Sequence, residues 1–293
     1  MKKIAILLII TSSFVFAQNT YVPDDKFEQA LIDLGYDTTL DDSVVTANIS
    51  GVTTLDVSNK EISDLTGIEA FTALINLNCE VNKLTALDVS ANTALNELHC
   101  PSNQLTSLDV SKNTALTYLH CSDNKLTSLD VSKNTVLNDL WCAGNKLTSL
   151  DVSANTALTH LDCSYNQLTS LDMSNNTVLE ALQVQDNQLT SLDVSNNTAL
   201  TYLDCSVNPL TTLSLTGHTA LTHLSCVNTQ VTSLDLGDCV NLEELFCQAN
   251  QLTYLNVSNS TALSDLWCQN NQLTSLDVSS NTALTDFNCS NNQ

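Results

Sequence analysis

Ten cysteines recur at a constant step of 21 residues, and thiols at fixed spacing can form disulfides, bind a metal or take part in redox chemistry. They are Cys79, Cys100, Cys121, Cys142, Cys163, Cys205, Cys226, Cys247, Cys268 and Cys289, and valine stands at the one missing position, 184. Nine of the ten follow a leucine by two residues, and Cys289 follows Phe287, so on a strand both side chains would point inward. We predict a column of reduced, buried thiols that pack as small apolar groups, with disulfides between repeats as the alternative. Zinc would require paired C-x-x-C spacing, which the sequence lacks.

An eleventh cysteine, Cys239, lies outside this column, where other repeats carry asparagine, as at Asn197 and Asn281. We expect Cys239, and Cys289 at the frayed end, to be the thiols that a reagent can reach.

Two columns that flank the second leucine of each repeat vary freely, whereas the leucine, cysteine and asparagine positions hardly change. Strand alternation turns both columns outward. They hold both tryptophans and four of the five histidines, and exposed aromatic side chains on a rigid sheet commonly bind partners. The alternative to ligand binding is that the residues in these columns vary without selection on the surface of a scaffold that binds nothing. The predicted ligand-binding residues are Tyr118, His120, Asp139, Trp141, His160, Asp162, Tyr202, Phe246 and Trp267.

Metal chemistry has weaker support in the sequence. His99 and His120 lie in one column on adjacent repeats, and a metal could bridge them beside Glu97 or Asp139, but no fixed third ligand is present. Aspartates also recur every 21 residues from Asp88, and calcium could relieve their repulsion. We favour the alternative, in which each aspartate caps its own turn with the serine two residues on. We predict no metal, no cofactor and no enzyme activity, because no nucleophile-base-acid set stands out.

The repeats that position these residues are nearly double, since each half reads L-x-x-L-x-(C/V)-x-x-N. Such a period predicts a repeat solenoid that grows by adding rungs. The second half is rich in Thr, Ser, Asp, Val and Asn, so the outer side should lack helices. We expect the asparagines to form a ladder that binds backbone groups at the turns. The ladder positions are Asn82, Asn103, Asn124, Asn145, Asn166, Asn187, Asn208, Asn250, Asn271 and Asn292.

The chain divides into three expected parts. Residues 1–17 have a charged start, a short apolar run and a small-residue cleavage site, as in a secretory signal peptide. Residues 18–51 are expected to form an N-terminal cap: one amphipathic helix over 24–34, with Phe27, Ala30, Leu31 and Leu34 inward, and a connector over 36–51. Residues 52–293 hold the repeats: one irregular 22-mer, ten 21-mers and one truncated repeat. The chain stops in mid-repeat, so we expect a further segment to follow.

The formal charge of -23, with nine lysines and no arginine, excludes the basic stripe that nucleic-acid binding requires and disfavours anionic lipid. Such an acidic excess keeps a protein soluble and monomeric. No second apolar run follows the leader, so no membrane insertion is expected after its cleavage.

The motif resembles the leucine-rich-repeat family over roughly residues 52 to 293, and within it the exported, internalin-like bacterial type. The start Pro-Asp-x-x-Phe-Glu-x-Ala-Leu-Ile at residues 23–32 is similar to that of secreted Bacteroidetes repeat proteins. The resemblance implies a right-handed superhelix whose concave parallel sheet binds other molecules. We therefore predict a secreted or cell-surface adhesion module for a protein or glycan ligand. The alternative function is a passive spacer of a larger surface protein.

Overall fold

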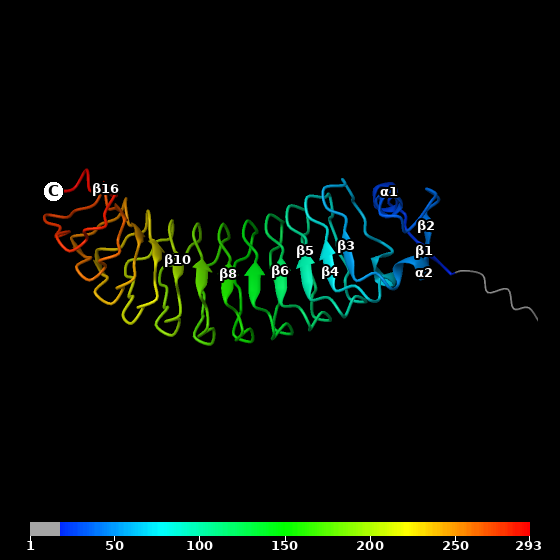
Figure 1. Ribbon diagram of the computed structural model, residues 1–293, viewed down its shortest axis with the longest axis horizontal. Coiled ribbons are helices and arrows are strands. Elements are labelled where there is room, and N and C mark those ends of the chain that lie inside the picture. Colours follow the sequence, from blue (N-terminus) through cyan, green and yellow to red (C-terminus); the bar gives the residue numbers. More distant parts are fainter. Residues whose placement is uncertain (1–17) are drawn as a thin grey trace, which may run out of the picture.

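The computed structural model describes residues 18–293, and the expected signal peptide, residues 1–17, lies outside the described residues. Twelve short strands form one parallel sheet along a bent stack of rungs (Figure 1), in the order β16-β15-β13-β11-β10-β9-β8-β7-β6-β5-β4-β3. The strands are β3 (Thr54–Asp56), β4 (Asn76–Asn78), β5 (Glu97–His99), β6 (Tyr118–His120), β7 (Asp139–Trp141), β8 (His160–Asp162), β9 (Ala181–Gln183), β10 (Tyr202–Asp204), β11 (His223–Ser225), β13 (Glu244–Phe246), β15 (Asp265–Trp267) and β16 (Asp286–Asn288).

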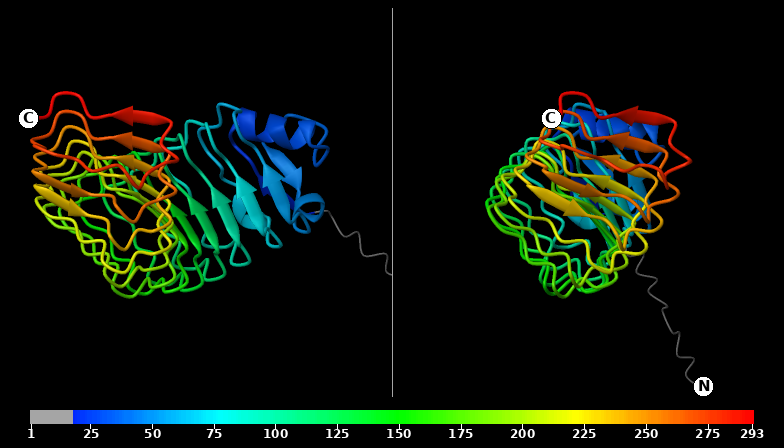
Figure 2. Two further views of the ribbon diagram at one scale, coloured as in Figure 1. Left: turned by 60° about the vertical axis from the view of Figure 1, so that its left-hand side comes forward. Right: turned by 90° about the vertical axis from the view of Figure 1, so that its left-hand side faces the viewer.

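In the twelve-stranded sheet, each strand from β4 to β15 is centred on the second leucine of its repeat, which the alternation of the strand turns into the core. Leu77, Leu119 and Leu203 are fully buried, as are the cysteines that follow two residues later. Between residues 72 and 293 the structure contains no helix. The outer side consists of turns and extended segments, including a second parallel pair, β12 (Ser233–Asp235) with β14 (Tyr254–Asn256). The predicted solenoid with a non-helical outer side is confirmed, and Figure 2 shows its rungs stacked behind one another.

The predicted asparagine ladder joins neighbouring rungs, with Thr229 in place of asparagine in one of them. Asn124 Nδ2 donates to the carbonyl of Cys121 in its own rung, at 3.2 Å, and to that of Cys100 in the preceding rung, at 3.0 Å. Asn124 Oδ1 accepts the backbone N–H of Leu105 at 2.9 Å. One buried amide therefore satisfies backbone groups on two rungs, which removes the cost of leaving them unpaired inside the stack.

The residue before each ladder asparagine has a left-handed backbone, with φ between +51° and +57° for the non-glycine residues from Val81 to Asn291. This conformation disfavours β-branched residues, yet valine occupies it at Val81 and Val207. Only Gly144, with φ +63°, brings glycine to this turn. At Val81 and Val207, the hydrogen bonds of the following asparagine hold a conformation that a β-branched residue does not favour.

A second ladder lies on the outer half of the rungs. Asn134 Nδ2 donates to Val110 O at 3.1 Å and to Asn113 O at 2.8 Å, but its Oδ1 has no hydrogen-bond partner. His218, Cys239 and Ser260 take the equivalent position in later rungs, and all three are fully buried. The expectation that Cys239 is accessible is therefore wrong, because this position points into the core whichever residue fills it.

The N-terminal cap covers the first rung with α1 (Asp25–Asp33) and the antiparallel pair β1 (Asn19–Tyr21) and β2 (Ser43–Val45). A short helix, α2 (Thr46–Ile49), follows β2, and a 3-10 turn, η1 (Ile68–Ala70), lies in the irregular first repeat. The expected connector over 36–51 thus contains a strand and a helix. Phe27, Ala30 and Leu31 are buried as predicted, but Leu34 is 46% exposed because the helix ends before it.

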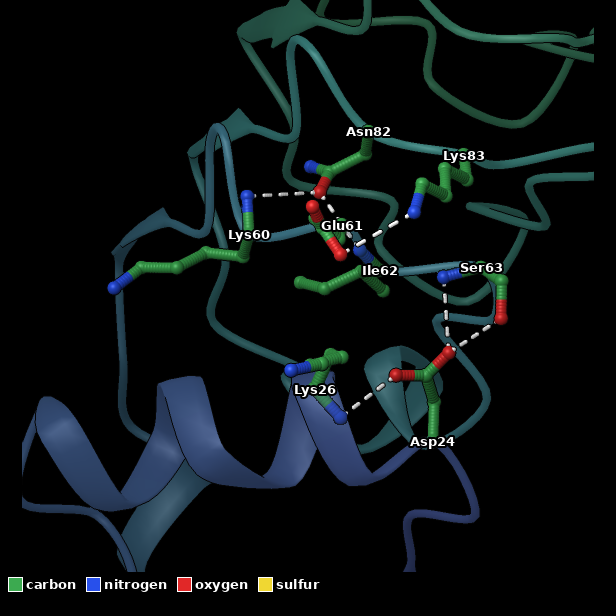
Figure 3. A network of polar contacts seen from close by, with 8 residues as sticks. All are labelled: Asp24, Lys26, Lys60, Glu61, Ile62, Ser63, Asn82 and Lys83. Carbon is green, nitrogen blue, oxygen red and sulfur yellow. Dashed lines mark hydrogen bonds and ion pairs between the residues drawn. The ribbon is translucent and has the colours of Figure 1, made fainter.

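Asp24 joins the cap to the stack (Figure 3). Its Oδ1 accepts the backbone N–H groups of Lys26 and Phe27 and so caps α1, while its Oδ2 accepts Ser63 Oγ at 2.7 Å and Ser63 N at 2.9 Å. On the other side of the same segment, Asn82 begins the ladder by accepting Ile62 N–H at 3.0 Å. One carboxylate therefore fixes both the start of the helix and its position on the first repeat.

No helix among residues 18–293 is long and apolar enough to cross a membrane.

The column cysteines are reduced in the structure, and those from Cys79 to Cys268 are buried. Burial raises the pKa of Cys79, Cys121 and Cys226 to about 12, because the thiolate loses its hydration in the core. Thiols that stay protonated are poor nucleophiles and poor metal ligands, as expected for packing groups.

Thiol labelling of the native protein should modify Cys289 alone, since it is the one exposed cysteine among the described residues. After denaturation all eleven thiols should react. Mass spectrometry of alkylated protein would measure both numbers. Rapid native labelling of Cys239 or of an interior column thiol would contradict the burial described above.

Asn124→Ala should lower the free energy of unfolding by roughly 3 kcal/mol, because the substitution leaves a buried donor and buried acceptors unpaired. Asn134→Ala in the outer ladder is the matched control. This substitution should lower the free energy of unfolding by less, on the order of 1 kcal/mol, since Asn134 Oδ1 accepts no hydrogen bond. Urea denaturation would compare the two variants, and a loss for Asn134→Ala as large as that for Asn124→Ala would rule out this ranking of the ladders.

Candidate functional site

The two variable columns lie on the outward side of the parallel sheet, here called the sheet face. Its surface consists of the first and last residue of each strand of the twelve-stranded sheet from β4 to β16, which are partly exposed in nearly every case. The core leucines and cysteines point the opposite way, so the sheet face is free of the packing duties of the rung. All nine predicted binding residues lie there, and the structure divides them into two groups.

The first group, the N-terminal cluster, lies on β5 to β8. The ring of Tyr118 stacks on His99, with centroids 4.7 Å apart, while Trp141 packs against His120 at 6.3 Å. Tyr118 therefore packs against the ring of His99 on the preceding rung. Asp139, His160 and Asp162 complete this cluster, and His160 Nδ1 lies 2.9 Å from Asp139 Oδ1.

The second group, the C-terminal cluster, is a continuous row of rings on β10 to β15. Tyr202 stacks flat on His223 at 4.4 Å with an interplanar angle of 3°, and His223 lies 5.4 Å from Phe246. Phe246 meets the ring of Trp267 edge-on at 5.7 Å and 82°. His223 Nδ1 is also 2.7 Å from Glu244 Oε2, which fixes the imidazole between ring and carboxylate.

His99 and His223 are central to these clusters although the sequence prediction omitted them. Both occupy the same variable columns as the chosen residues, so the columns could have identified them. The rings of His99 and His120 meet edge-on, with centroids 6.5 Å apart and an interplanar angle of 70°. Their column position therefore produces aromatic packing rather than a set of ligands converging on one point.

Burial and neighbouring charges shift the pKa of several of these side chains. Desolvation, and next the neighbouring His99, lower the pKa of His120, which favours its neutral form at physiological pH. Desolvation and the nearby Asp139 raise the pKa of Tyr118, and desolvation with Asp204 does the same for Tyr202. Both tyrosines therefore remain neutral and can offer a hydroxyl and a ring face to a ligand.

The sheet face has no deep pocket at the N-terminal cluster. A hollow of about 10 Å³ lies between Trp141, His160, Asp162 and Gln183. Larger cavities lie elsewhere, as on the outer side beside Asp172 and Asp193, with about 230 Å³. A shallow surface of aromatic, carboxylate and imidazole groups suits an extended partner better than a small enclosed molecule.

The recurring aspartates bind their own turns. In the column from Asp88 to Asp193, and again at Asp277, each Oδ1 accepts the backbone N–H of the serine two residues on, at 2.8 to 2.9 Å. These hydrogen bonds hold the pKa of the carboxyls below its usual range. The turn-capping interpretation is confirmed.

Within residues 18–293, the group of side chains that could hold a metal ion is in the cap: carboxylate oxygens of Glu28, Asp37 and Asp41 lie within 4.8 Å of one another. Glu28 is fully buried, and its two oxygens already accept the backbone N–H groups of Asp41, Asp42 and Ser43. Backbone donors therefore account for this buried carboxylate.

Comparison with known proteins identifies relatives with the same architecture. The functional domain of InlJ from Listeria monocytogenes, described as including a cysteine ladder, is 35% identical with a TM-score of 0.62. The match covers 96% of this chain and 77% of that domain. The Leptospira interrogans leucine-rich-repeat protein LIC12759 has the same fold, with a TM-score of 0.71 at 23% identity over 85% of this chain and 74% of that one.

Internalin J of Listeria monocytogenes serotype 4b (strain F2365) is 42% identical over 74 residues, which are 25% of this chain and 8% of that protein. The chain therefore matches a small part of that protein's length. No protein-family model matches the chain. The InlJ domain nonetheless shares the fold, the cysteine ladder and 35% of aligned residues across most of both molecules. This chain belongs to the internalin-like family of leucine-rich-repeat proteins, in the form that carries a cysteine ladder.

Proposed function

We propose that the protein is a non-enzymatic binding module, exported and presented at the cell surface, which recognises a protein or a glycan through its sheet face. Internalin-like repeat domains are typically binding modules, and internalin homologues are surface proteins. The expected signal peptide at residues 1–17 agrees with export.

One observation carries this proposal: large aromatic side chains lie on the sheet face, where the fold does not need them. Trp141 and Trp267 are partly exposed, and the rung core is complete without them because leucine, valine and cysteine fill it. Their indole Nε1 atoms are buried and have no hydrogen-bond partner, so local bonding does not explain their presence either. Exposed tryptophan and tyrosine on a rigid scaffold supply contact area at little cost in conformational entropy.

A passive spacer remains the second function to test, because a solenoid can act by its length alone. That function requires nothing of the sheet face, so substitutions there would have no effect on any interaction. A glycan array and a pull-down of surface proteins with residues 18–293 would identify ligands, whose binding to the parent protein and to its variants can then be compared.

Trp141→Ala should weaken binding of such a ligand by roughly 2 kcal/mol or more, because a central exposed tryptophan is a typical hot spot. The fold should persist, as judged by circular dichroism and thermal unfolding. Thr148→Ala, on the exposed turn of the same rung, is the control and should bind like the parent. Equal binding by the parent, Trp141→Ala and Trp267→Ala would contradict recognition through the sheet face and favour the spacer.

A further inference from the structure

Basic residues are confined to the first half of the chain. All nine are lysines, the last is Lys146, and residues 147–293 contain neither lysine nor arginine. The C-terminal half of the sheet face nevertheless carries Asp204, Glu244, Asp265 and Asp286. Its negative charge therefore has no fixed cationic side chain to neutralise it, unlike the N-terminal half, where Lys83 and Lys125 follow ladder asparagines.

The strand register places these acids beside the aromatic row. Glu244 pairs with Asp265 and Asp265 with Asp286, so three carboxylates follow one another on adjacent strands, about 4.8 Å apart at the backbone. Phe246 pairs with Trp267 in the neighbouring column of the same strands. A column of carboxylates thus runs along a row of rings.

Local donors satisfy these carboxylates only in part. Asp265 Oδ2 accepts Ser264 Oγ at 2.6 Å, and Glu244 contacts His223 while its side chain stays 46% exposed. Asp286 is exposed at the following rung. Like charges on adjacent strands disfavour each other, and an incoming cation relieves that repulsion.

We propose that the C-terminal cluster, with Glu244, Asp265 and Asp286, binds a lysine- or arginine-rich extended segment of a partner protein. Ammonium and guanidinium groups form charge-assisted hydrogen bonds with carboxylates and cation–π contacts with Trp267, Phe246 and Tyr202. A neutral glycan would use the rings but leave the charges uncompensated, and an anionic polymer would be repelled. This inference rests on the proposed function and specifies the chemistry of the partner.

The test uses a fluorescent peptide of alternating lysine and glycine, with serine–glycine and glutamate–glycine peptides as comparisons, and fluorescence anisotropy with residues 18–293. The lysine peptide alone should bind, and its affinity should fall steeply as ionic strength rises from about 0.05 to about 0.5 M. Trp267→Ala should also weaken it, by about 10-fold.

The matched pair of variants is Asp265→Asn and Asp277→Asn. Both remove one negative charge from the same repeat, but Asp265 lies on the sheet face and Asp277 caps an outer turn. We expect about a 10-fold loss of affinity for Asp265→Asn and less than about 2-fold for Asp277→Asn. Thermal unfolding of both variants would verify that each remains folded.

Equal losses of affinity for the lysine peptide in the two aspartate variants would overturn the inference, because the peptide would then be attracted by the net charge of the protein and not by the sheet face. A second outcome is that the protein does not bind the lysine peptide but binds a neutral glycan or neutral protein in a way that depends on Trp141 and is insensitive to salt. This result would overturn the inference but leave the proposed function standing. If substitution of Trp141, Asp265 or Trp267 changed the binding of no ligand, both this inference and the proposed function would be refuted.

Discussion

The whole stack depends on a buried amide that bonds to two rungs at once. A solenoid without helices on its outer side turns its backbone sharply in every repeat, and each turn leaves N–H and C=O groups inside the protein. The ladder asparagine, as at Asn124, supplies both a donor and an acceptor for those groups. No apolar residue can do so, and the net cost of an unpaired buried group is larger than the gain from a typical hydrogen bond.

This requirement determines which positions are left for recognition. Leucine and cysteine fill the core, asparagine joins the rungs, and aspartate with serine closes the outer turns. The residues that flank the central leucine of each strand are mostly free of these duties, although Asp162 and Asp204 each accept the backbone N–H of the serine two residues on. Their side chains stand on a sheet that adjacent rungs hold rigid, so aromatic groups such as Trp141 and Trp267 could meet the proposed partner without a local ordering cost.

Charge divides the sheet face into two regions with different chemistry. The N-terminal cluster combines Tyr118 and Trp141 with histidines, and these two rings lie in the half of the chain that also contains lysine. The C-terminal cluster has rings beside three successive carboxylates and no lysine or arginine in its half of the chain. A single scaffold can therefore offer two surfaces, because each rung contributes two side chains independently of its neighbours' cores.

The sequence by itself determined what a repeating pattern can specify: the rungs, the inward cysteine column, the ladder and the outward columns that hold the predicted binding residues. These follow from the 21-residue period and from strand alternation, which act within one rung. Only the tertiary structure decided the contacts between rungs and in the unique cap. Tyr118 packs on His99, Cys239 is buried, Leu34 is exposed, and residues 43–45 form a strand. Such contacts depend on side-chain rotamers and on the packing of segments distant in sequence, which no period encodes.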